Sequence, residues 1–585
     1  MEKRVLLAVA LSFVVLYGYQ AMFPPPKPPQ RTPASSQAAS TPATGTADPA
    51  PQSAAQGPPA PQLEAPAAPA APAAAPVVAD KDEREIVVEN DSVRAVFTTR
   101  GGVLKSWRLK KYQDAAKAPL EIVPQDTPAG LPRPFTLSVD DAKISAVLSQ
   151  ALFRPSATAL DVRSGPAMLV FEYADASGLR ARKQLSFHPK NPYVVHLSAS
   201  VEQGGTPLVP IVHWGPGVGN ALSVNTSNYV MPPRPILNRD GDVERVKVAK
   251  IAEVANTQGV FGFAGVDDHY FMTAAVGVKE PVALHFEPVA VPAHAGAKAP
   301  PPPYISWSIK FNRPPNGVAF FAGPKDFDVL AAVDRDLVRA IDFGMFAFLV
   351  VPLLRALKWV NVYVGNYGWS IVLLTVIINV VMFPLRHKSV VSMRRMQEIQ
   401  PEVKAIQDRY ANLKMTDPAR QKMNTEMMAL YKERGVNPAS GCVPMLLTLP
   451  VLFAFYAMLS VAIELRGAPF IWWIKDLSVY DPLFITPILM GATQFVQTRM
   501  TPSTADPTQQ RVMLLMPLVF MFMFIWAPSG LVLYWTVSNL WAIGQQALTN
   551  RLIGPPSQRT VRPPAERQLK AAGAGRSDKA AKERR

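Results

Sequence analysis

The chain has 585 residues, enough for several domains, and carries a net charge of +16. Its basic residues gather in 386–434 and after 551, a pattern typical of the cytoplasmic flanks of membrane helices, and no nucleic-acid module or zinc-ligand spacing accompanies them. Cys442 is the only cysteine, which excludes an intramolecular disulfide and a cysteine-based metal cluster.

The first 82 residues predict an anchor and a tether. Residues 1–23 hold Lys3 and Arg4 followed by a 19-residue apolar run, typical of a signal anchor or of a cleaved signal peptide. The length of the run favours an uncleaved anchor whose N-terminus lies inside the cell. Residues 24–82 are rich in Pro, Ala, Ser and Gln and cannot bury a core, so we expect a disordered tether.

Residues 83–325 predict a large antiparallel β-sandwich on the outer side of the cytoplasmic membrane. Apolar and polar residues alternate there in runs bounded by turn residues, which indicates half-buried strands. The clearest alternating runs are 103–109, 167–173, 193–201 and 305–311. No nucleophile motif or paired-carboxylate signature stands out in this domain, so we expect no catalytic activity from it.

Two segments lead into the membrane part. Residues 326–365 repeat apolar residues such as Leu330 and Leu337 at spacings of three and four, which predicts an amphipathic interfacial helix. If this segment spanned the membrane, the basic segment 386–434 would lie outside the cell, against the positive-inside rule. Residues 366–386 are almost unbroken apolar residues and predict transmembrane helix 2, long enough to cross a bilayer core of roughly 30 Å.

Residues 387–440 predict a basic cytoplasmic helical hairpin. Apolar residues recur with helical spacing from Met396 to Tyr410 and again from Met423 to Tyr431, and a Thr-Asp-Pro turn signal separates the two runs. The hairpin is either a mere connector or a docking site. Its Met-rich stripe and basic outer face suit a ribosome, a targeting factor or a nascent chain.

The rest of the chain predicts four more spans. They are transmembrane helices at 441–465, 483–499, 512–527 and 531–549, with an external loop at 466–482, a cytoplasmic loop at 500–511 and a basic cytoplasmic tail at 550–585. The predicted fold class is therefore a polytopic α-helical membrane protein with six transmembrane helices, five of them in a core, and with both termini in the cytoplasm.

The predicted spans carry uncharged polar residues rather than deep ionisable ones. Each could simply bond to a neighbouring helix, because an unpaired amide such as that of Asn379 is costly in hydrocarbon. Together with Met and aromatic residues they predict a hydrated groove that accepts many apolar sequences. The predicted groove residues are Thr375, Asn379, Thr448, Met490, Gln494, Tyr534 and Trp535.

Two other functions remain open from the residues alone. One is a solute channel or transporter component, although ion-coupled transporters usually need ionisable groups at membrane depth. The other is an external polymer-binding module that is merely anchored in the membrane, for which the β-domain would be sufficient.

Four stretches match one known family. They are NPASGCVP at 437–444, ELRGAPF at 464–470, PILMG at 487–491 and PSGLVLYWTVSN at 528–539. On these residues and on its layout, the chain resembles the YidC insertases of Gram-negative inner membranes, within the YidC/Oxa/Alb family. The resemblance is strong from about residue 326 to residue 552, weaker over the β-domain, and absent from the tether and the distal tail.

The resemblance implies a membrane protein insertase and chaperone of the inner membrane that is not an enzyme and has no cofactor. It implies as partners nascent membrane proteins, the Sec translocon, the lipid bilayer, and a ribosome or targeting factor at the hairpin and basic tail, but no specific nucleic-acid sequence. It also implies a supersandwich-like β-domain in the periplasm. Thr375, Tyr534 and Trp535 match substrate-contacting positions, whereas Asn379 stands where relatives usually carry Arg.

Overall fold

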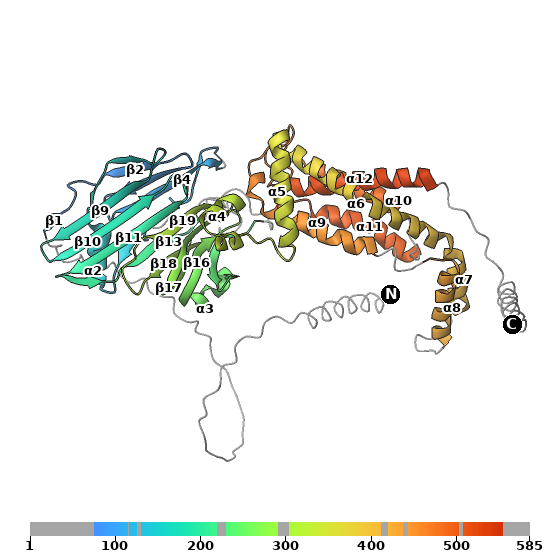
Figure 1. Cartoon of the computed structure of the whole chain (residues 1–585), viewed down its shortest axis with the longest axis horizontal. Coiled ribbons are helices and arrows are strands. Elements are labelled where there is room, and N and C mark those ends of the chain that lie inside the picture. The colour runs from blue at the N-terminus through green and yellow to red at the C-terminus, as the bar shows by residue number, and fades with distance from the viewer. Residues whose placement is uncertain are drawn as a thin grey trace, which may run out of the picture. The chain divides into compact units, whose positions relative to one another are not determined.

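The computed structural model describes residues 75–114, 116–125, 130–218, 230–290, 303–410, 419–436, 443–501 and 507–553. The predicted anchor, nearly all of the predicted tether and the tail beyond residue 553 lie outside these described residues. Within them, a β-rich part is followed along the chain by a helical part (Figure 1).

The β-rich part contains two sheets. The larger sheet has 14 strands: β1 Pro76–Val78, β6 Thr136–Ser138, β7 Arg154–Pro155, β9 Ala167–Asp175, β10 Leu179–Phe187, β11 Val194–Gln203, β12 Thr206–Leu208, β13 Ile211–Pro216, β14 Arg234–Arg239, β15 Asp242–Arg245, β16 Asn256–Asp267, β17 Phe271–Val289, β18 Tyr304–Lys310 and β19 Val318–Pro324. The smaller sheet has five: β2 Glu85–Glu89, β3 Val93–Thr98, β4 Val103–Gln113, β5 Pro119–Glu121 and β8 Ala159–Asp161.

The four alternating sequence runs do form strands, because they correspond to β4, β9, β11 and β18. Strand β10, which lies between β9 and β11, shows the same alternation. Along β10 the residues at every second position are buried, and the strand pairs antiparallel with β9 and with β11. Two details differ from the expectation. Strand β8 pairs parallel with β2. Strand β1, inside the predicted tether, pairs with β9, because Val77 and Val78 have the β-branched side chains that favour strands.

The two sheets share one hydrophobic core. The ring of Phe97 on β3 lies 6.3 Å from that of Phe171 on β9 and 6.1 Å from that of Phe187 on β10. The indole Nε1 of Trp107 on β4 donates to the carbonyl of Ala322 on β19 at 2.9 Å. These contacts confirm a large sheet-rich domain whose interior is built from aromatic side chains.

A completely buried lysine lies in this core. The Nζ of Lys183 donates to the carbonyl oxygens of Gly101, Gly102 and Phe135 at 3.0, 2.8 and 2.5 Å. Gly101 and Gly102 both have positive φ, so their tight turn presents its carbonyls inward. Burial lowers the pKa of the Lys183 ammonium to about 7.

The helical part follows strand β19. Its elements are α4 Phe327–Val333, η2 Asp336–Ala340, α5 Ala347–Val364, α6 Tyr367–Glu398, α7 Gln400–Arg409, α8 Ala419–Glu433, α9 Val443–Val461, η4 Ile463–Leu465, α10 Ile485–Met500, α11 Pro507–Met523 and α12 Ser529–Ile553; the earlier short helices are α2 Ala142–Gln150, η1 Val248–Lys250 and α3 Ile251–Val254. Helices α5 and α6 are long and apolar enough to cross a membrane, and α9 and α11 contain shorter apolar stretches.

Three predicted boundaries differ from the ends of the helices. Residues 326–365 form α4, η2 and α5 rather than one helix, with Asp326 capping α4 and extended backbone at Asp334 ending it. Helix α6 continues beyond residue 386 to Glu398, because no helix-breaking residue intervenes. Helix α11 begins at Pro507, inside the loop predicted at 500–511.

The predicted hairpin corresponds to α7 and α8. Their apolar faces form a small separate core of Ile399, Val403, Ile406, Leu430 and Val436. An ion pair between Glu402 and Arg434 closes the open end of the hairpin. The connection between the two helices lies outside the described residues.

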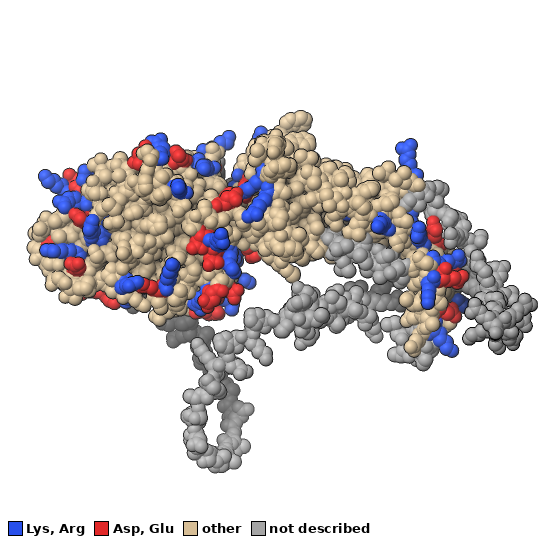
Figure 2. All heavy atoms as spheres, in the orientation of Figure 1, with Lys and Arg blue, Asp and Glu red and all other residues tan. Residues whose placement is uncertain are grey.

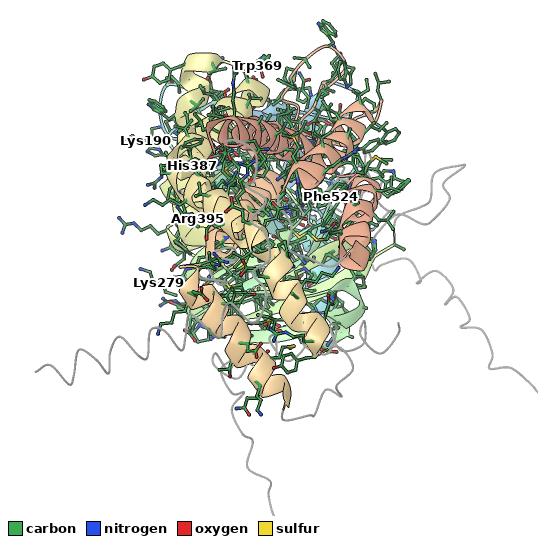
Figure 3. The ribbon with its side chains drawn as sticks, turned by 90° about the vertical axis from the view of Figure 1, so that its right-hand side faces the viewer. Lys190, Lys279, Trp369, His387, Arg395 and Phe524 are labelled. Atoms are coloured by element: carbon green, nitrogen blue, oxygen red, sulfur yellow. The ribbon has the colours of Figure 1, made fainter. Side chains whose placement is uncertain are left out.

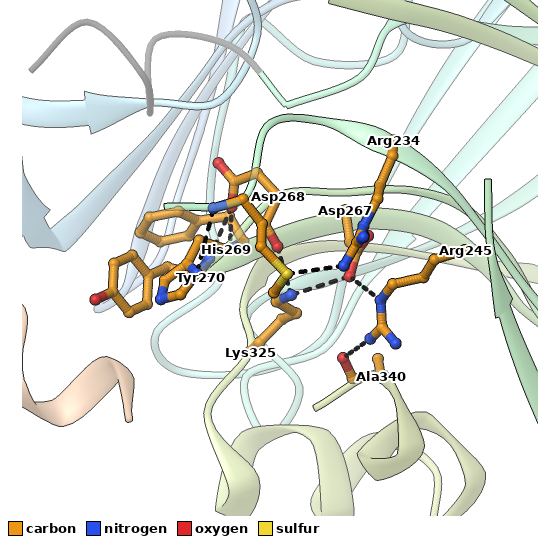
Figure 4. Close-up of polar contacts among 10 residues, drawn as sticks. Arg234, Arg245, Asp267, Asp268, His269, Tyr270, Lys325 and Ala340 are labelled. Carbon is orange, nitrogen blue, oxygen red and sulfur yellow. Dashed lines mark hydrogen bonds and ion pairs between the residues drawn. The ribbon is translucent and has the colours of Figure 1, made fainter. Parts of the chain in front are cut away.

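A charged cluster around Asp267 lies where the β-rich part meets the helical part (Figure 4). The buried carboxylate of Asp267 on β16 forms ion pairs with Lys325 at 2.9 Å and with Arg245 at 3.1 Å, and Arg245 donates to the carbonyl of Ala340 in η2. Next to it, the His269 Nε2 lies 2.7 Å from the carbonyl oxygen of Ser460 on α9. The cluster therefore links the last strands to the start of the helical part.

Candidate functional site

The helical part contains a cavity of about 610 Å³ between α6, α9, α10 and α12. Five of the seven predicted groove residues line it: Thr375, Asn379, Gln494, Tyr534 and Trp535. Met490 does not line it: its side chain is buried, and its backbone carbonyl accepts from the Nδ2 of Asn539 on α12 at 3.4 Å. The side chain of Thr448 lies outside the described residues, although its backbone belongs to α9.

The α6 wall of the cavity carries a chain of hydrogen bonds. The hydroxyl of Thr375 donates to the carbonyl of Ile371 at 2.6 Å, and the Nδ2 of Asn379 donates to the carbonyl of Thr375 at 2.8 Å. Both side chains are buried. The amide of Asn379 is thus satisfied within its own helix rather than by a neighbouring one, and it is held at the cavity surface.

An arginine that the sequence analysis did not select completes this wall. The Nη1 of Arg386 donates to the Oδ1 of Asn379 at 2.8 Å, and Arg386 also lines the cavity. Among the lining residues in the described part of the chain, Arg386 is the one charged side chain. The spacing of seven residues, two helical turns, could have revealed it, because such residues share a helix face.

The opposite wall combines amides with aromatic rings. The Nε1 of Trp535 donates to the Oε1 of Gln494 at 3.1 Å, which joins α12 to α10. The ring of Tyr534 stacks on Phe455 of α9, with centroids 4.5 Å apart. Asn539 donates to Thr493 at 3.3 Å and closes the wall behind them.

Apolar, flexible side chains also line the cavity. Met382, Met393 and Met513 contribute unbranched thioethers, and Leu452 contributes an aliphatic surface. Such side chains adapt to ligands of different shape, whereas the amides, hydroxyls and Arg386 offer donors and acceptors to a polar segment. The described residues contain no cluster of His, Cys, Asp or Glu able to hold a metal ion.

The exterior around the cavity is suited to lipid. Charged side chains gather over the strands and over α7 and α8, and the visible surface of α6 and α12 between them is almost free of charge (Figure 2). Trp369 lies near the start of α6, and His387 and Arg395 lie farther along it, towards α7 (Figure 3). An apolar belt with an aromatic residue at one end and cations at the other is typical of a membrane-spanning helix.

Comparisons with known proteins identify the family of both parts of the chain. Residues 85–356 match the YidC periplasmic domain, and residues 359–555 match the 60Kd inner membrane protein family. A membrane protein insertase YidC from Geobacter metallireducens is 36% identical over 94% of this chain and 99% of its own length. The corresponding protein from Syntrophus aciditrophicus is 35% identical over 94% of this chain and 100% of its own length.

A crystal structure of an active YidC insertase with its first transmembrane domain resolved matches 82% of this chain and 95% of its own, with 19% identity and a TM-score of 0.32. The names of these relatives do not favour the alternative of a solute channel or transporter. The function that they support is insertion of proteins into the inner membrane, without enzymatic activity. The chain therefore belongs to the YidC family of membrane protein insertases.

Proposed function

We propose that this insertase moves the polar flank of an incoming membrane protein through the cavity beside Asn379 and Arg386, which we call the groove. The apolar segment of the substrate then slides along the Met and aromatic surface into lipid. The observation that carries the proposal is the convergence of amides, hydroxyls and one guanidinium on one 610 Å³ cavity between apolar helices.

The physical basis is desolvation. A polar flank that enters hydrocarbon without partners loses its hydrogen bonds to water, and each unpaired group costs about 1–3 kcal/mol. Asn379, Gln494 and Arg386 replace part of that hydration with fixed donors and acceptors. The apolar segment needs no such help, because its transfer from water to lipid is favourable.

We further propose the membrane arrangement and the partners. The chain would cross the membrane six times with both termini in the cytoplasm, and α5 would lie at the interface, although its length and hydropathy also suit a span. The basic residues in 386–434 and the positive-inside rule support this orientation. The hairpin of α7 and α8 and the basic tail would receive a ribosome or targeting factor, and the Sec translocon would act beside the groove on some substrates.

A crosslinking scan tests the groove directly. A photoreactive side chain at Asn379 should crosslink to the nascent chain of a small two-span substrate during insertion. The same probe at Val381, which lies on the same helix and is 73% exposed, should crosslink much less to the polar flank. Equal crosslinking of that flank at both positions would show that it does not pass through the groove.

Protease protection tests the function of the whole chain. Depletion of the protein should leave the loop of a two-span substrate on the cytoplasmic side of the membrane, where protease added to that side can cleave it. Deletion of residues 83–323 should leave much of the insertion intact, whereas the polymer-binding alternative predicts complete loss. Normal insertion in the depleted cells, of a substrate with no other route, would contradict the proposal.

A further inference from the structure

A second cavity, of about 560 Å³, lies between α6 and α12 on a neighbouring face of the two helices. It is lined by Val380, Phe383 and Pro384 of α6 and by Trp541, Gly544 and Gln545 of α12, among others. We refer to it as the α6–α12 slot. Gln545 lines both the slot and the groove, whereas Asn379 and Arg386 line the groove but not the slot.

Gly544, which has no side chain, and Pro384, which has no backbone N–H, shape the slot. Gly544 contributes no side chain, and a Cβ added there would meet no atom within 4 Å, so the glycine leaves an opening in the surface of α12. On the facing helix, Pro384 has no N–H to donate to the carbonyl of Val380, one turn earlier. This carbonyl needs another partner or remains unpaired at the slot.

Unpartnered donors also face this region. The Gln545 side chain is 7% exposed, and its Nε2 has no hydrogen-bond partner among the described residues. The Nε1 of Trp541 is likewise buried and without a partner in the described part of the chain. Buried donors are costly unless they are paired, so the slot calls for a ligand that brings acceptor oxygens as well as an apolar body.

Cations lie at one end of the slot. Lys388 follows Pro384 by four residues and Arg551 follows Gly544 by seven, so each lies on the slot face of its helix, farther along in the same direction. His387 stacks on Phe383 with ring centroids 5.8 Å apart. Its Nδ1 lies 3.3 Å from the Thr549 hydroxyl, and this contact joins α6 to α12 near the two cations in sequence. The slot is therefore apolar along its length and positively charged at one mouth.

The lining of the slot suits a thin, apolar ligand. Nearly all of its lining side chains are aliphatic or aromatic, and Gln545 is the one amide among them. A single hydrocarbon chain is narrow enough to enter, and the cations at the mouth match a negatively charged headgroup.

We propose that the α6–α12 slot binds one phospholipid with an anionic headgroup. One acyl chain lies between Val380 and Gly544, the ester and phosphate oxygens accept from Gln545, and Lys388 and Arg551 hold the headgroup charge. The proposal rests on the proposed membrane orientation of α6 and α12, but not on the route of the substrate. Through Gln545, the bound lipid forms part of the back wall of the groove.

Native mass spectrometry of the full chain in detergent tests the site, with phosphatidylglycerol and phosphatidylcholine of the same acyl chains as probes. The wild-type protein should retain one phosphatidylglycerol, with at least about tenfold preference over phosphatidylcholine because two cations face the headgroup. Gly544→Leu fills the slot and should abolish retention of both lipids. Ala547→Leu adds the same bulk on an exposed face of α12, outside the slot, and should behave as wild type.

A double variant, Lys388→Gln with Arg551→Gln, should retain both lipids equally and weakly. Unchanged phosphatidylglycerol retention by Gly544→Leu would overturn the proposal and indicate only non-specific annular lipid. Displacement of the lipid by an apolar substrate peptide would also overturn it and assign the slot to substrate.

If Gly544→Leu does not fold, Trp541→Phe removes a donor without adding bulk and should lower retention severalfold. Arg386→Gln should keep the lipid, so failure of the groove proposal and failure of the lipid proposal give different results.

Discussion

Arg386 reaches back two turns along α6 and donates to the Oδ1 of Asn379 at 2.8 Å, so these two residues form one polar unit at the surface of the groove. The amide fixes the position of the guanidinium, and the guanidinium satisfies the amide oxygen. Sequence analysis alone predicted a groove without a fixed charge at position 379. In the structure, Arg386, two turns closer to the hairpin, places its guanidinium beside Asn379.

Removal of this charge should affect substrates according to their flanks. Arg386→Gln keeps a donor for Asn379 but loses the charge, so insertion of a substrate with an acidic translocated flank should slow about fivefold, equivalent to about 1 kcal/mol. A neutral-flank version of the same substrate should insert almost normally. Arg386→Lys serves as the control, and insertion is measured by protease protection. Equal slowing of both substrates would assign Arg386 a structural role.

Exchange of the two residues tests whether the unit or the position matters. The double variant Asn379→Arg with Arg386→Asn keeps the same pair of groups on the same helix face, and it should recover most of the insertion lost in Arg386→Asn alone. The readout is the double-mutant coupling for an acidic-flank substrate. Strictly additive losses would mean that the two side chains act independently.

Replacement of Asn379 by an apolar residue should separate polar from apolar substrates. Asn379→Leu removes both the acceptor for Arg386 and the polar surface beside Thr375. Insertion should fall severalfold for substrates with long polar flanks and change little for those with short apolar ones. Uniform activity on both substrate types would favour a simple packing role for this residue.

The buried lysine of the β-domain should contribute strongly to stability. Lys183→Met leaves three buried carbonyl oxygens, at Gly101, Gly102 and Phe135, without their donor, and it should lower the free energy of unfolding by about 2–4 kcal/mol. Thermal melting followed by circular dichroism would measure the loss. Lys279→Met, at an exposed position on β17, is the matched control and should leave the melting temperature within a few degrees of wild type.

Acid should destabilise the β-domain through its buried histidines. Burial lowers the pKa of His213 and of His269 to about 4, from 6.5 in the unfolded chain. Below pH 6.5 the unfolded chain therefore takes up protons that the folded chain does not, and stability falls progressively down to pH 4, by up to about 3 kcal/mol for each residue.

Asp268 opposes part of this effect, because burial raises its pKa to about 6 and makes its contribution to stability greatest at low pH. His213→Gln keeps a side-chain partner for Ser138, which lies 2.6 Å from the His213 Nε2. The variant should show a smaller fall in melting temperature between pH 7 and pH 5. An unchanged pH dependence would assign the acid sensitivity to other groups.

Local patterns predicted the elements well and the contacts between them less well. Period-two alternation identified strands such as β9, and the almost unbroken apolar run identified the first part of α6, because both patterns are set by neighbours along the chain. The groove residues Tyr534 and Trp535 of α12 followed from the aromatic residues in its span and from the family resemblance. Met490 does not line the cavity, and composition alone does not say which face of α10 is directed towards it.

Arg386 was missed for a related reason. The predicted end of the span at residue 386 assigned this side chain to the membrane surface, whereas α6 continues to Glu398 and keeps Arg386 in register with Asn379. The pairing of the two sheets and the cluster around Asp267 depend on residues far apart in the chain, which no local pattern records.

The continuity of α6 has a mechanical consequence. Its 32 residues measure about 48 Å at 1.5 Å per residue, longer than a bilayer core of roughly 30 Å. Helix α6 is therefore one continuous helix from Asn379 to the start of the hairpin, and Pro384 is the position at which it can bend. A partner that docked on α7 and α8, as proposed above, would act on the groove through α6 itself rather than through a loop, and would change the angle of the groove wall.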